Sequence, residues 1–219
     1  MGAIVGVVLA AGPGTRFDPE TGSEDDAGVN EGESIRGGNK LLATIDDEPI
    51  VRRAALTLVV DEVDRTIGVV ARDDLAVRDT VAAVVDETVD NPVPAVGQGR
   101  SVALGARRAA AIGADAAVFL PGDMPLVDKQ TTRRLVAAYR STDDSPDTIV
   151  PTHDGRRGNP VLFDAAQFEA LESLSGDVGG RALFDAIDVR RLPVEDPGIH
   201  RDVDTTADLE RLRRSIDGD

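Results

Sequence analysis

The chain has 219 residues, a formal net charge of −16, no cysteine and only 3% aromatic side chains. This length suits one α/β domain whose core is built from Val, Leu, Ala and Ile. The lack of cysteine excludes disulfides, thiolate metal sites and a cysteine nucleophile. The negative charge disfavours nucleic acid and anionic membranes as partners.

No apolar stretch of the sequence is long enough to span a bilayer, and no basic region precedes the apolar start. We therefore expect a cytoplasmic protein with no membrane partner. Aspartate far outnumbers glutamate, and lysine occurs only at Lys40 and Lys129. This composition resembles that of proteins from salt-loving archaea, so it predicts a halophilic protein.

The apolar run at 4–10 predicts a strand buried on both faces, and a loop of small residues ending at Arg16 follows it. Small residues at the carboxyl end of a parallel strand let backbone N–H groups approach an anion. Phe17 stands where the dinucleotide fingerprint needs its third glycine, and Asn39–Lys40–Leu41 is no Walker A loop. The segment predicts either another kind of phosphate loop or a tight turn with no ligand.

The segment at 17–39 is rich in Asp, Glu, Gly and Ser and is nearly free of apolar residues. Because it cannot offset its ordering entropy by burial, we expect a mobile acidic insertion. Lys40 follows this insertion. A chain that otherwise avoids lysine has one here, which favours a role for Lys40 beside the glycine-rich loop.

Strands and helices alternate over the first two thirds of the chain. The predicted helices are 49–60, 73–83, 100–112 and 129–140, and the predicted strands after the first are 66–71, 84–85 and 116–120. This alternation predicts an α/β fold with a doubly wound, mainly parallel sheet and helices on both faces.

The pattern changes from about residue 145. A hairpin turn at 153–156 lies between predicted strands. The elements expected in this part are strands 148–151, 160–163 and 189–193, short helices 164–171 and 179–187, and a closing helix 205–216. We find no linker and expect one domain over 1–219, with a nucleotide-binding half at 1–145 and an acceptor-binding half at 146–219.

Carboxylates stand at two points suited to a metal. Asp123 lies in a turn directly after the apolar strand 116–120, where a doubly wound fold would hold a metal ion. Mg²⁺ takes one or two carboxylates together with phosphate oxygens and water. Asp202 and Asp204 precede the closing helix, and the alternative for Asp204 is an ordinary helix N-cap, a position that Thr205 could also fill.

These segments together resemble the signatures of the MobA-like nucleotidyltransferases, a family with a nucleotide-diphospho-sugar transferase-like Rossmann-type fold. The segments are L-A-A-G-x-G-x-R at 9–16, the Asp-x-Pro turn at 123–125, R-G-N-P at 157–160, G-D-x-G-x-R at 176–181 and D-x-D-T at 202–205. The chain is most similar to the molybdenum cofactor cytidylyltransferases. Its main departure is the long insertion between Arg16 and Lys40.

The resemblance implies a role for each matching residue. Arg16, Lys40 and Asp123 are implied to be catalytic, and Asp123 and Asp204 to hold Mg²⁺, with Asp202 as the fallback. The implied nucleotide-binding residues are Leu9, Ala10, Ala11, Gly12, Gly14, Thr15, Gly99 and Ser101. The implied acceptor-facing residues are Arg157, Gly158, Asn159, Pro160, Gly176, Asp177 and Arg181.

The resemblance also implies the reaction, which is transfer of a nucleoside monophosphate from an NTP to the phosphate of molybdopterin, with release of pyrophosphate. The Ala10–Ala11–Gly12 form of the loop favours CTP. Docking to a molybdoenzyme or its chaperone is a further expectation. The alternatives are a GTP-dependent guanylyltransferase, a sugar-1-phosphate nucleotidyltransferase and, from another class, a non-catalytic nucleotide sensor.

Overall fold

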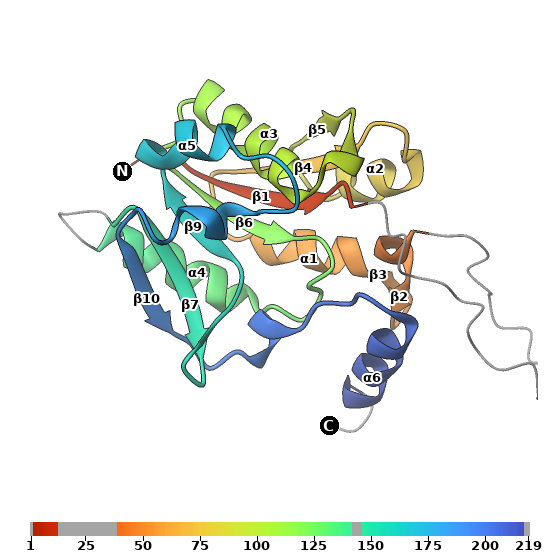
Figure 1. The fold of residues 1–219 in the computed structure, drawn as a ribbon. Coiled ribbons are helices and arrows are strands. Elements are labelled where there is room, and N and C mark those ends of the chain that lie inside the picture. The colour runs from red at the N-terminus through yellow and green to blue at the C-terminus, as the bar shows by residue number, and fades with distance from the viewer. Residues whose placement is uncertain (1, 13–38, 142–145, 217–219) are drawn as a thin grey trace, which may run out of the picture.

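The computed structural model describes residues 2–12, 39–141 and 146–216 (Figure 1). The strands in this part of the chain are β1 (Ile4–Ala10), β2 (Thr44–Ile45), β3 (Glu48–Pro49), β4 (Arg65–Ala71), β5 (Glu87–Asn91), β6 (Ala116–Pro121), β7 (Thr148–His153), β8 (Arg156–Arg157), β9 (Val161–Asp164) and β10 (Val189–Pro193). The α-helices are α1 (Ile50–Leu58), α2 (Leu75–Ala82), α3 (Gln98–Ala111), α4 (Lys129–Arg140), α5 (Phe168–Glu172) and α6 (Thr206–Ile216).

The main sheet has the strand order β10–β7–β9–β6–β1–β4–β5, with β8 paired to the end of β7. Strand β1 pairs in parallel with both β4 and β6, and β4 with β5 and β7 with β10 are also parallel. Strand β9 runs antiparallel between β6 and β7. The mainly parallel sheet predicted from the alternating pattern is therefore confirmed.

Strand β1 is the centre of two core layers, one on each face of the sheet. Ile4 and Val8 pack with residues of α1, α2 and α4, whereas Val5 and Val7 pack with residues of α3 and α5. The side chains alternate because successive residues of a strand point to opposite faces. Helices cover both faces of the sheet, as Figure 1 shows, and the prediction that β1 is buried on both faces is confirmed.

Three short elements differ from the sequence pattern. The strand predicted at 84–85 is wrong, because Val84 and Val85 donate to Val81 O in a turn that ends α2, and β5 begins only at Glu87. The helix predicted at 179–187 is reduced to the 3₁₀ turn η4 (Gly180–Leu183), since it begins with two glycines, which favour helix weakly. The helix predicted at 164–171 begins as the 3₁₀ turn η3 (Ala165–Gln167) before α5.

Two hairpins close at tight turns. The predicted turn after β7 is confirmed, with Asp154 and Gly155 both in the left-handed region at φ 51° and 75°. Such a two-residue turn matches the twist of paired strands. The hairpin of β2 and β3 was not predicted, because its turn residues Asp46 and Asp47 lack the usual glycine. This small hairpin packs with α6 in a separate apolar cluster.

In the parts of the chain that the structure describes, no helix has the length and apolarity needed to cross a membrane.

The connection between β4 and β5 yields a stability prediction. Asp86 accepts hydrogen bonds from the Thr66 backbone N–H at 2.7 Å and from its hydroxyl at 2.9 Å, and these bonds hold the pKa of Asp86 below its ordinary value of 3.8. A lowered folded-state pKa stabilises the fold above pH 3.8, and this contribution disappears as the pH falls through the folded-state value. Asp86→Asn should therefore lose less stability on acidification than the wild type.

The effect should be below about 1 kcal/mol, because Asp86 is exposed and solvent screens its interactions. Chemical denaturation from pH 7 to pH 3 measures it, and Asp79→Asn, an exposed residue of α2, is the matched control. Equal pH slopes for the two variants would contradict the assigned bonds.

Candidate functional site

The centre of the candidate site is one ammonium group between two carboxylates. Lys40 Nζ lies 2.8 Å from Asp123 Oδ2 and 2.7 Å from Asp204 Oδ1. The Lys40 side chain is only 13% exposed, so its charge is largely withdrawn from water. The structure thus brings together three residues that are far apart in the chain.

Lys40 is fixed by its neighbours in the 3₁₀ turn η1 (Lys40–Leu42). Leu41 is buried in the core beside α1, and Asn39 caps the turn by accepting a hydrogen bond from the Leu41 N–H at 3.0 Å. The other end of the Asn39 amide donates to Asp74 at 2.7 Å. The insertion that precedes Asn39 therefore does not carry Lys40 away from the site.

Backbone hydrogen bonds to β1 and to the segment before α6 position the turn that carries Asp123. The Gly122 N–H donates to Leu9 O at 2.9 Å, which joins the turn after β6 to the end of β1. The Val203 N–H donates to Asp123 O at 2.9 Å, which joins the same turn to the segment before α6. These two bonds explain why carboxylates from β6 and from the end of the chain meet at the exit of β1.

The segment 196–204 carries Asp202 and Asp204 across the carboxyl edge of the sheet. Asp196, at the start of this segment, holds it in place. Its buried carboxylate accepts hydrogen bonds from the Asp128 N–H at 2.9 Å, the Thr131 hydroxyl at 2.7 Å and the Gly198 N–H at 2.8 Å. These bonds anchor the segment to the N-terminus of α4.

The cap of α6 is made by Thr205. The Thr205 Oγ1 accepts from the Asp208 N–H at 3.2 Å, while Asp208 Oδ2 accepts from the Thr205 N–H at 2.8 Å. This reciprocal arrangement satisfies the free N–H groups at the start of the helix. The Asp204 carboxylate is consequently available for Lys40, and the alternative role of Asp204 as the helix N-cap is not what the geometry shows.

The charges at the centre perturb each other. Burial acts to lower the pKa of Lys40, but attraction to Asp123 and hydrogen bonds to both carboxylates outweigh it, so the pKa lies above its ordinary value of 10.5. Burial, together with the negative charges of Asp204 and Asp123, raises the pKa of Asp202 above 3.8. The cluster of Lys40, Asp123 and Asp204 carries a net negative charge, which favours a further cation.

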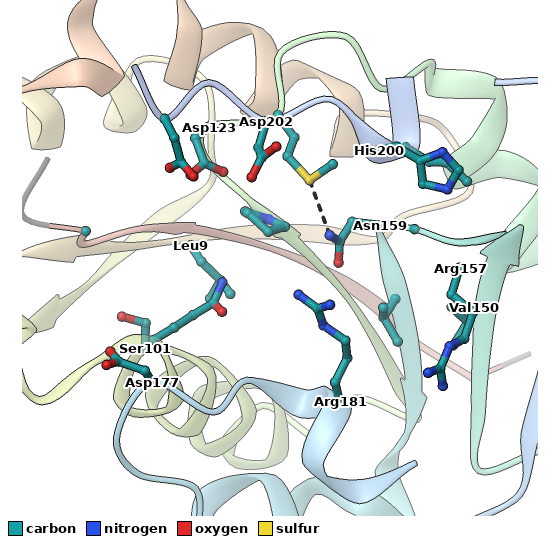
Figure 2. A pocket seen from close by; sticks show the side chains of 18 of the residues that line it. Leu9, Ser101, Asp123, Val150, Arg157, Asn159, Asp177, Arg181, His200 and Asp202 are labelled. Atoms are coloured by element: carbon teal, nitrogen blue, oxygen red, sulfur yellow. Dashed lines mark hydrogen bonds between the residues drawn. The ribbon is translucent and has the colours of Figure 1, made fainter. Parts of the chain in front are cut away.

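A cavity of about 960 Å³ extends from this cluster along the carboxyl edge of the sheet. Figure 2 shows Asp123 and Asp202 on one side of it, and Arg157 and Arg181 on the other. Asn159 lies between the two sides and donates from Nδ2 to Met124 Sδ at 3.3 Å. Asp123 and Asp202 thus face Arg157 and Arg181 across the cavity, and a further carboxylate, Asp177, lies beside Ser101.

The R-G-N-P segment is held against the segment 196–204. The Asn159 N–H donates to Ile199 O at 3.0 Å, and the Gly158 N–H donates to Pro151 O at 2.9 Å. A Cβ on Gly158 would lie 2.5 Å from Ile199 O, so only glycine allows this close approach. Arg157 is placed with its guanidinium 5.3 Å from the centre of the Phe184 ring.

The loop 97–99 and the loop 176–178 are docked on each other. The Gly99 N–H donates to Gly176 O at 2.9 Å. Gly97 has φ +107°, and a Cβ there would lie 2.4 Å from the Gly176 backbone. The implied nucleotide-binding role of Gly99 remains a prediction, and its N–H already has an acceptor on the other loop. The amide thereby joins a loop of the first half to a loop of the second.

The predicted site residues divide into three groups. Those that line the cavity are Leu9, Ala11, Gly12, Lys40, Ser101, Asp123, Arg157, Gly158, Asn159, Asp177, Arg181 and Asp204. Those that the structure describes but that do not line it are Ala10, Gly99, Pro160 and Gly176. Gly14, Thr15 and Arg16, and the insertion at 17–39 apart from Asn39, lie outside the described residues.

The sequence did not single out several residues that line the cavity. Gln98 and the turn η2 (Pro94–Val96) border it near Ser101, whose hydroxyl accepts from Asn91 Nδ2 at 3.1 Å. His200 and Arg191 also line the cavity. The strand pattern alone does not show that Arg191 faces the cavity, because this depends on the register of β10 against β7.

The donor set fits a divalent metal ion. Within the described ranges, no three side chains of His, Cys, Asp or Glu form a metal cluster by themselves. Mg²⁺ and similar ions need only one or two protein carboxylates when phosphate oxygens and water complete the shell. Asp123 and Asp204 already approach one cation together, so they are the residues that would hold such an ion.

A doubly wound sheet with a carboxylate pair and a lysine at the exit of its first strand has its ligand site where α/β folds of the nucleotide-binding class place one. Comparison with known proteins agrees. The chain belongs to the MobA-like NTP transferase domain family, which matches residues 6–192.

Individual relatives are similar to this chain to different extents. The bifunctional protein GlmU of Clavibacter sepedonicus is 31% identical over 170 residues, covering 74% of this chain but only 31% of that protein, so the chain spans about a third of its length. The crystal structure of Rv0371c from Mycobacterium tuberculosis has 26% identity and a TM-score of 0.71, covering 97% of this chain and 98% of that one. A structure of Rv0371c in complex with manganese has a TM-score of 0.68.

A more distant structure shows the fold alone. Molybdopterin-guanine dinucleotide biosynthesis protein A from Archaeoglobus fulgidus is 16% identical, with a TM-score of 0.66 over 98% of this chain and all of that one.

The hydrogen bonds of Asp196 predict a loss of stability when its carboxylate is replaced. Asp196→Asn replaces one acceptor oxygen by an NH₂ group that faces N–H and O–H donors, so the free energy of unfolding should fall by about 2–3 kcal/mol. Chemical denaturation measures the loss, and Glu195→Gln, an exposed neighbour, should be nearly neutral. Equal stability of the two variants would contradict the anchoring role of Asp196.

Proposed function

We propose that this protein transfers CMP from CTP to the phosphate of molybdopterin and releases pyrophosphate, with Mg²⁺ or a similar divalent ion. The observation that carries the proposal is the convergence of Lys40, Asp123 and Asp204 at the exit of β1, inside a cavity large enough for two ligands. The family supplies the class of reaction. The positions of Lys40, Asp123 and Asp204 support the role proposed for each of them.

In the reaction, an oxygen of the acceptor phosphate forms a bond to the α-phosphorus of the NTP, and the bond from that phosphorus to the bridging oxygen of the β-phosphate breaks. The leaving pyrophosphate takes the electron pair. Such phosphoryl chemistry depends on positioning and charge neutralisation more than on covalent help from the protein. The cavity provides for both, with backbone near Gly12 for the phosphates and charged groups on either side.

Lys40 and the two carboxylates have complementary tasks. The Lys40 ammonium holds Asp123 and Asp204 together against their mutual repulsion, and its high pKa keeps it charged at neutral pH. In the reaction this charge would stabilise the leaving pyrophosphate, together with Arg16. Asp123 and Asp204 would hold the divalent ion, which neutralises charge on the phosphates when bound. The manganese complex of Rv0371c supports a divalent ion in this family.

The nucleotide and the acceptor are proposed to use the two halves of the chain. Leu9, Ala11, Gly12 and Ser101 of the first half border the cavity beside β1 and α3. The acceptor would lie against residues of the second half, chiefly Arg157, Asn159 and Arg181, because planar guanidinium groups suit an anionic ligand. The molybdopterin-related neighbour from Archaeoglobus fulgidus is consistent with this acceptor.

A nucleotide panel tests the proposed function. Pyrophosphate release is measured with molybdopterin and each of the four NTPs, in Mg²⁺ and in Mn²⁺, at a fixed KCl concentration. CTP should exceed the others by about tenfold or more in kcat/KM. Preference for GTP would replace the cytidylyl assignment by a guanylyl one. Failure of all four would refute molybdopterin as the acceptor, and replacement of molybdopterin by glucose 1-phosphate would then test the sugar alternative.

Asp123→Ala should reduce turnover by about 10³-fold or more, because it removes one of the two carboxylates that would hold the divalent ion. Its thermal unfolding should stay close to that of the wild type, since Asp204 still pairs with Lys40 and the anchoring bond uses the backbone oxygen of residue 123. Asp79→Ala on α2 is the exposed control. An active Asp123→Ala enzyme would refute the metal role.

Lys40→Ala should lower kcat by about 10²–10³-fold and change KM for CTP much less, because charge develops on pyrophosphate mainly as the bond breaks. The chain offers a matched control in Lys129→Ala, which removes the other lysine at the exposed start of α4. Steady-state kinetics of the two variants decide the point. If both variants behave as the wild type, Lys40 has no part in the reaction.

A further inference from the structure

Three arginines line the part of the cavity across from Asp123, Asp202 and Asp204. Arg157 lies on β8, Arg181 on η4 and Arg191 on β10, and all three line the cavity. Arg157 pairs with Thr152 and Arg191 with Val150, and these two residues of β7 are two apart. Paired residues, and residues two apart on a strand, share a face of the sheet. Arg157 and Arg191 therefore project from the same face.

Phe184 belongs to the same group. The Arg157 guanidinium lies 5.3 Å from the centre of its ring, and the ring packs in the core layer that includes Val150. A guanidinium held against an aromatic face keeps its N–H edge free for an anion. Figure 2 shows Arg181 projecting into the cavity toward Asn159, on the side where Arg157 and Val150 lie.

The charges of these arginines are not matched by carboxylates. Elsewhere, arginines form ion pairs, such as Arg108 with Glu87 at 2.7 Å and Arg53 with Asp46 at 2.9 Å. In the described part of the chain, no carboxylate lies within 4.0 Å of the guanidinium groups of Arg157, Arg181 and Arg191. Arg156 also lines the cavity, but it pairs with His153 and so projects from the other face of the sheet. Three arginines without a carboxylate partner in one cavity of a chain with net charge −16 indicate a negatively charged ligand.

The distance across the sheet separates this group from the reaction centre. Asp123 follows β6, and β10 is three places away in the order β10–β7–β9–β6. Neighbouring strands are about 4.8 Å apart, so β10 lies roughly 14 Å from β6. The arginine group is exposed to the cavity, and this spacing favours a second anionic group, distinct from the phosphate beside Lys40, as its ligand.

We propose that Arg157, Arg181 and Arg191 form an anion subsite for a second negatively charged group of the acceptor, at the end opposite to the attacking phosphate. The acceptor is then a molecule with anionic groups at two ends, and a neutral sugar bearing a single phosphate leaves the subsite unused. This inference rests on the proposed function for the direction of the acceptor. It adds Arg191, which lies outside the family signatures, as a specificity-determining residue.

The test compares two probes that differ only in the second anion, glucose 1-phosphate and glucose 1,6-bisphosphate. Their dissociation constants are measured by calorimetry on the full chain without nucleotide, at one fixed KCl concentration. The wild type should bind the bisphosphate about tenfold more tightly than the monophosphate, because an anion gains charge-assisted hydrogen bonds at the subsite.

Two neighbouring variants isolate the subsite. Arg191→Gln should abolish most of the bisphosphate preference. Arg190→Gln is the matched control, because Arg190 is adjacent on β10, points to the other face and donates to Ala138 O at 3.2 Å. It should keep the preference. Equal affinity of the wild type for both probes, or equal behaviour of the two variants, would overturn the subsite.

The outcomes separate this inference from the proposed function. If Arg191 controls the preference while no NTP supports transfer to molybdopterin, the subsite stands and the proposed reaction fails. If transfer occurs without any preference that depends on Arg191, the reaction stands and the subsite fails.

Discussion

The arrangement depends on one interaction, the sharing of a single largely buried ammonium by two carboxylates from distant parts of the chain. A buried lysine without a partner would be neutralised or would destabilise the fold. Asp123 and Asp204 remove that penalty, and together they exceed the charge of Lys40. This net negative group of Lys40, Asp123 and Asp204 is therefore suited to attract a divalent cation and, through that cation, the phosphates of a nucleotide.

Backbone contacts make this convergence possible. The bond from Val203 N–H to Asp123 O joins the last segment of the chain to the turn after β6, and Asp196 fixes that segment to α4. The loops around Gly99 and Gly176 join the two halves in the same way on the other wall. The cavity lies between these two connections, with Asp123, Asp202 and Asp204 at one end and the guanidinium groups of Arg157, Arg181 and Arg191 across from them. This separation of charge gives the bound ligands a direction.

Local patterns were sufficient for the elements whose signal is local. The apolar run of β1, the Asp-Gly turn after β7 and the carboxylate that ends β6 each depend on a few adjacent residues, and the sequence predicted their positions. The sequence also predicted a role for Lys40 beside the glycine-rich loop, but the way Lys40 is held could not be predicted, because it depends on burial of Leu41 after a long insertion. The cap of α6 likewise depends on which of two adjacent residues meets Asp208.

Local patterns are insufficient where the partner of a group lies far away in the sequence. The Gly99 N–H donates to Gly176 O, on a loop of the other half of the chain. Arg190 and Arg191 are adjacent, and only the register of β10 against β7 shows that Arg191 faces the cavity. Tertiary register, which no local pattern contains, decided both cases.

The most direct test of the central claim is the affinity for Mn²⁺, measured by the paramagnetic signal of the free ion in the wild type and in Asp204→Asn and Asp202→Asn. The account predicts that Asp204→Asn weakens Mn²⁺ binding by about 10–100-fold, whereas Asp202→Asn weakens it much less. Wild-type affinity in Asp204→Asn would contradict the shared-cation site.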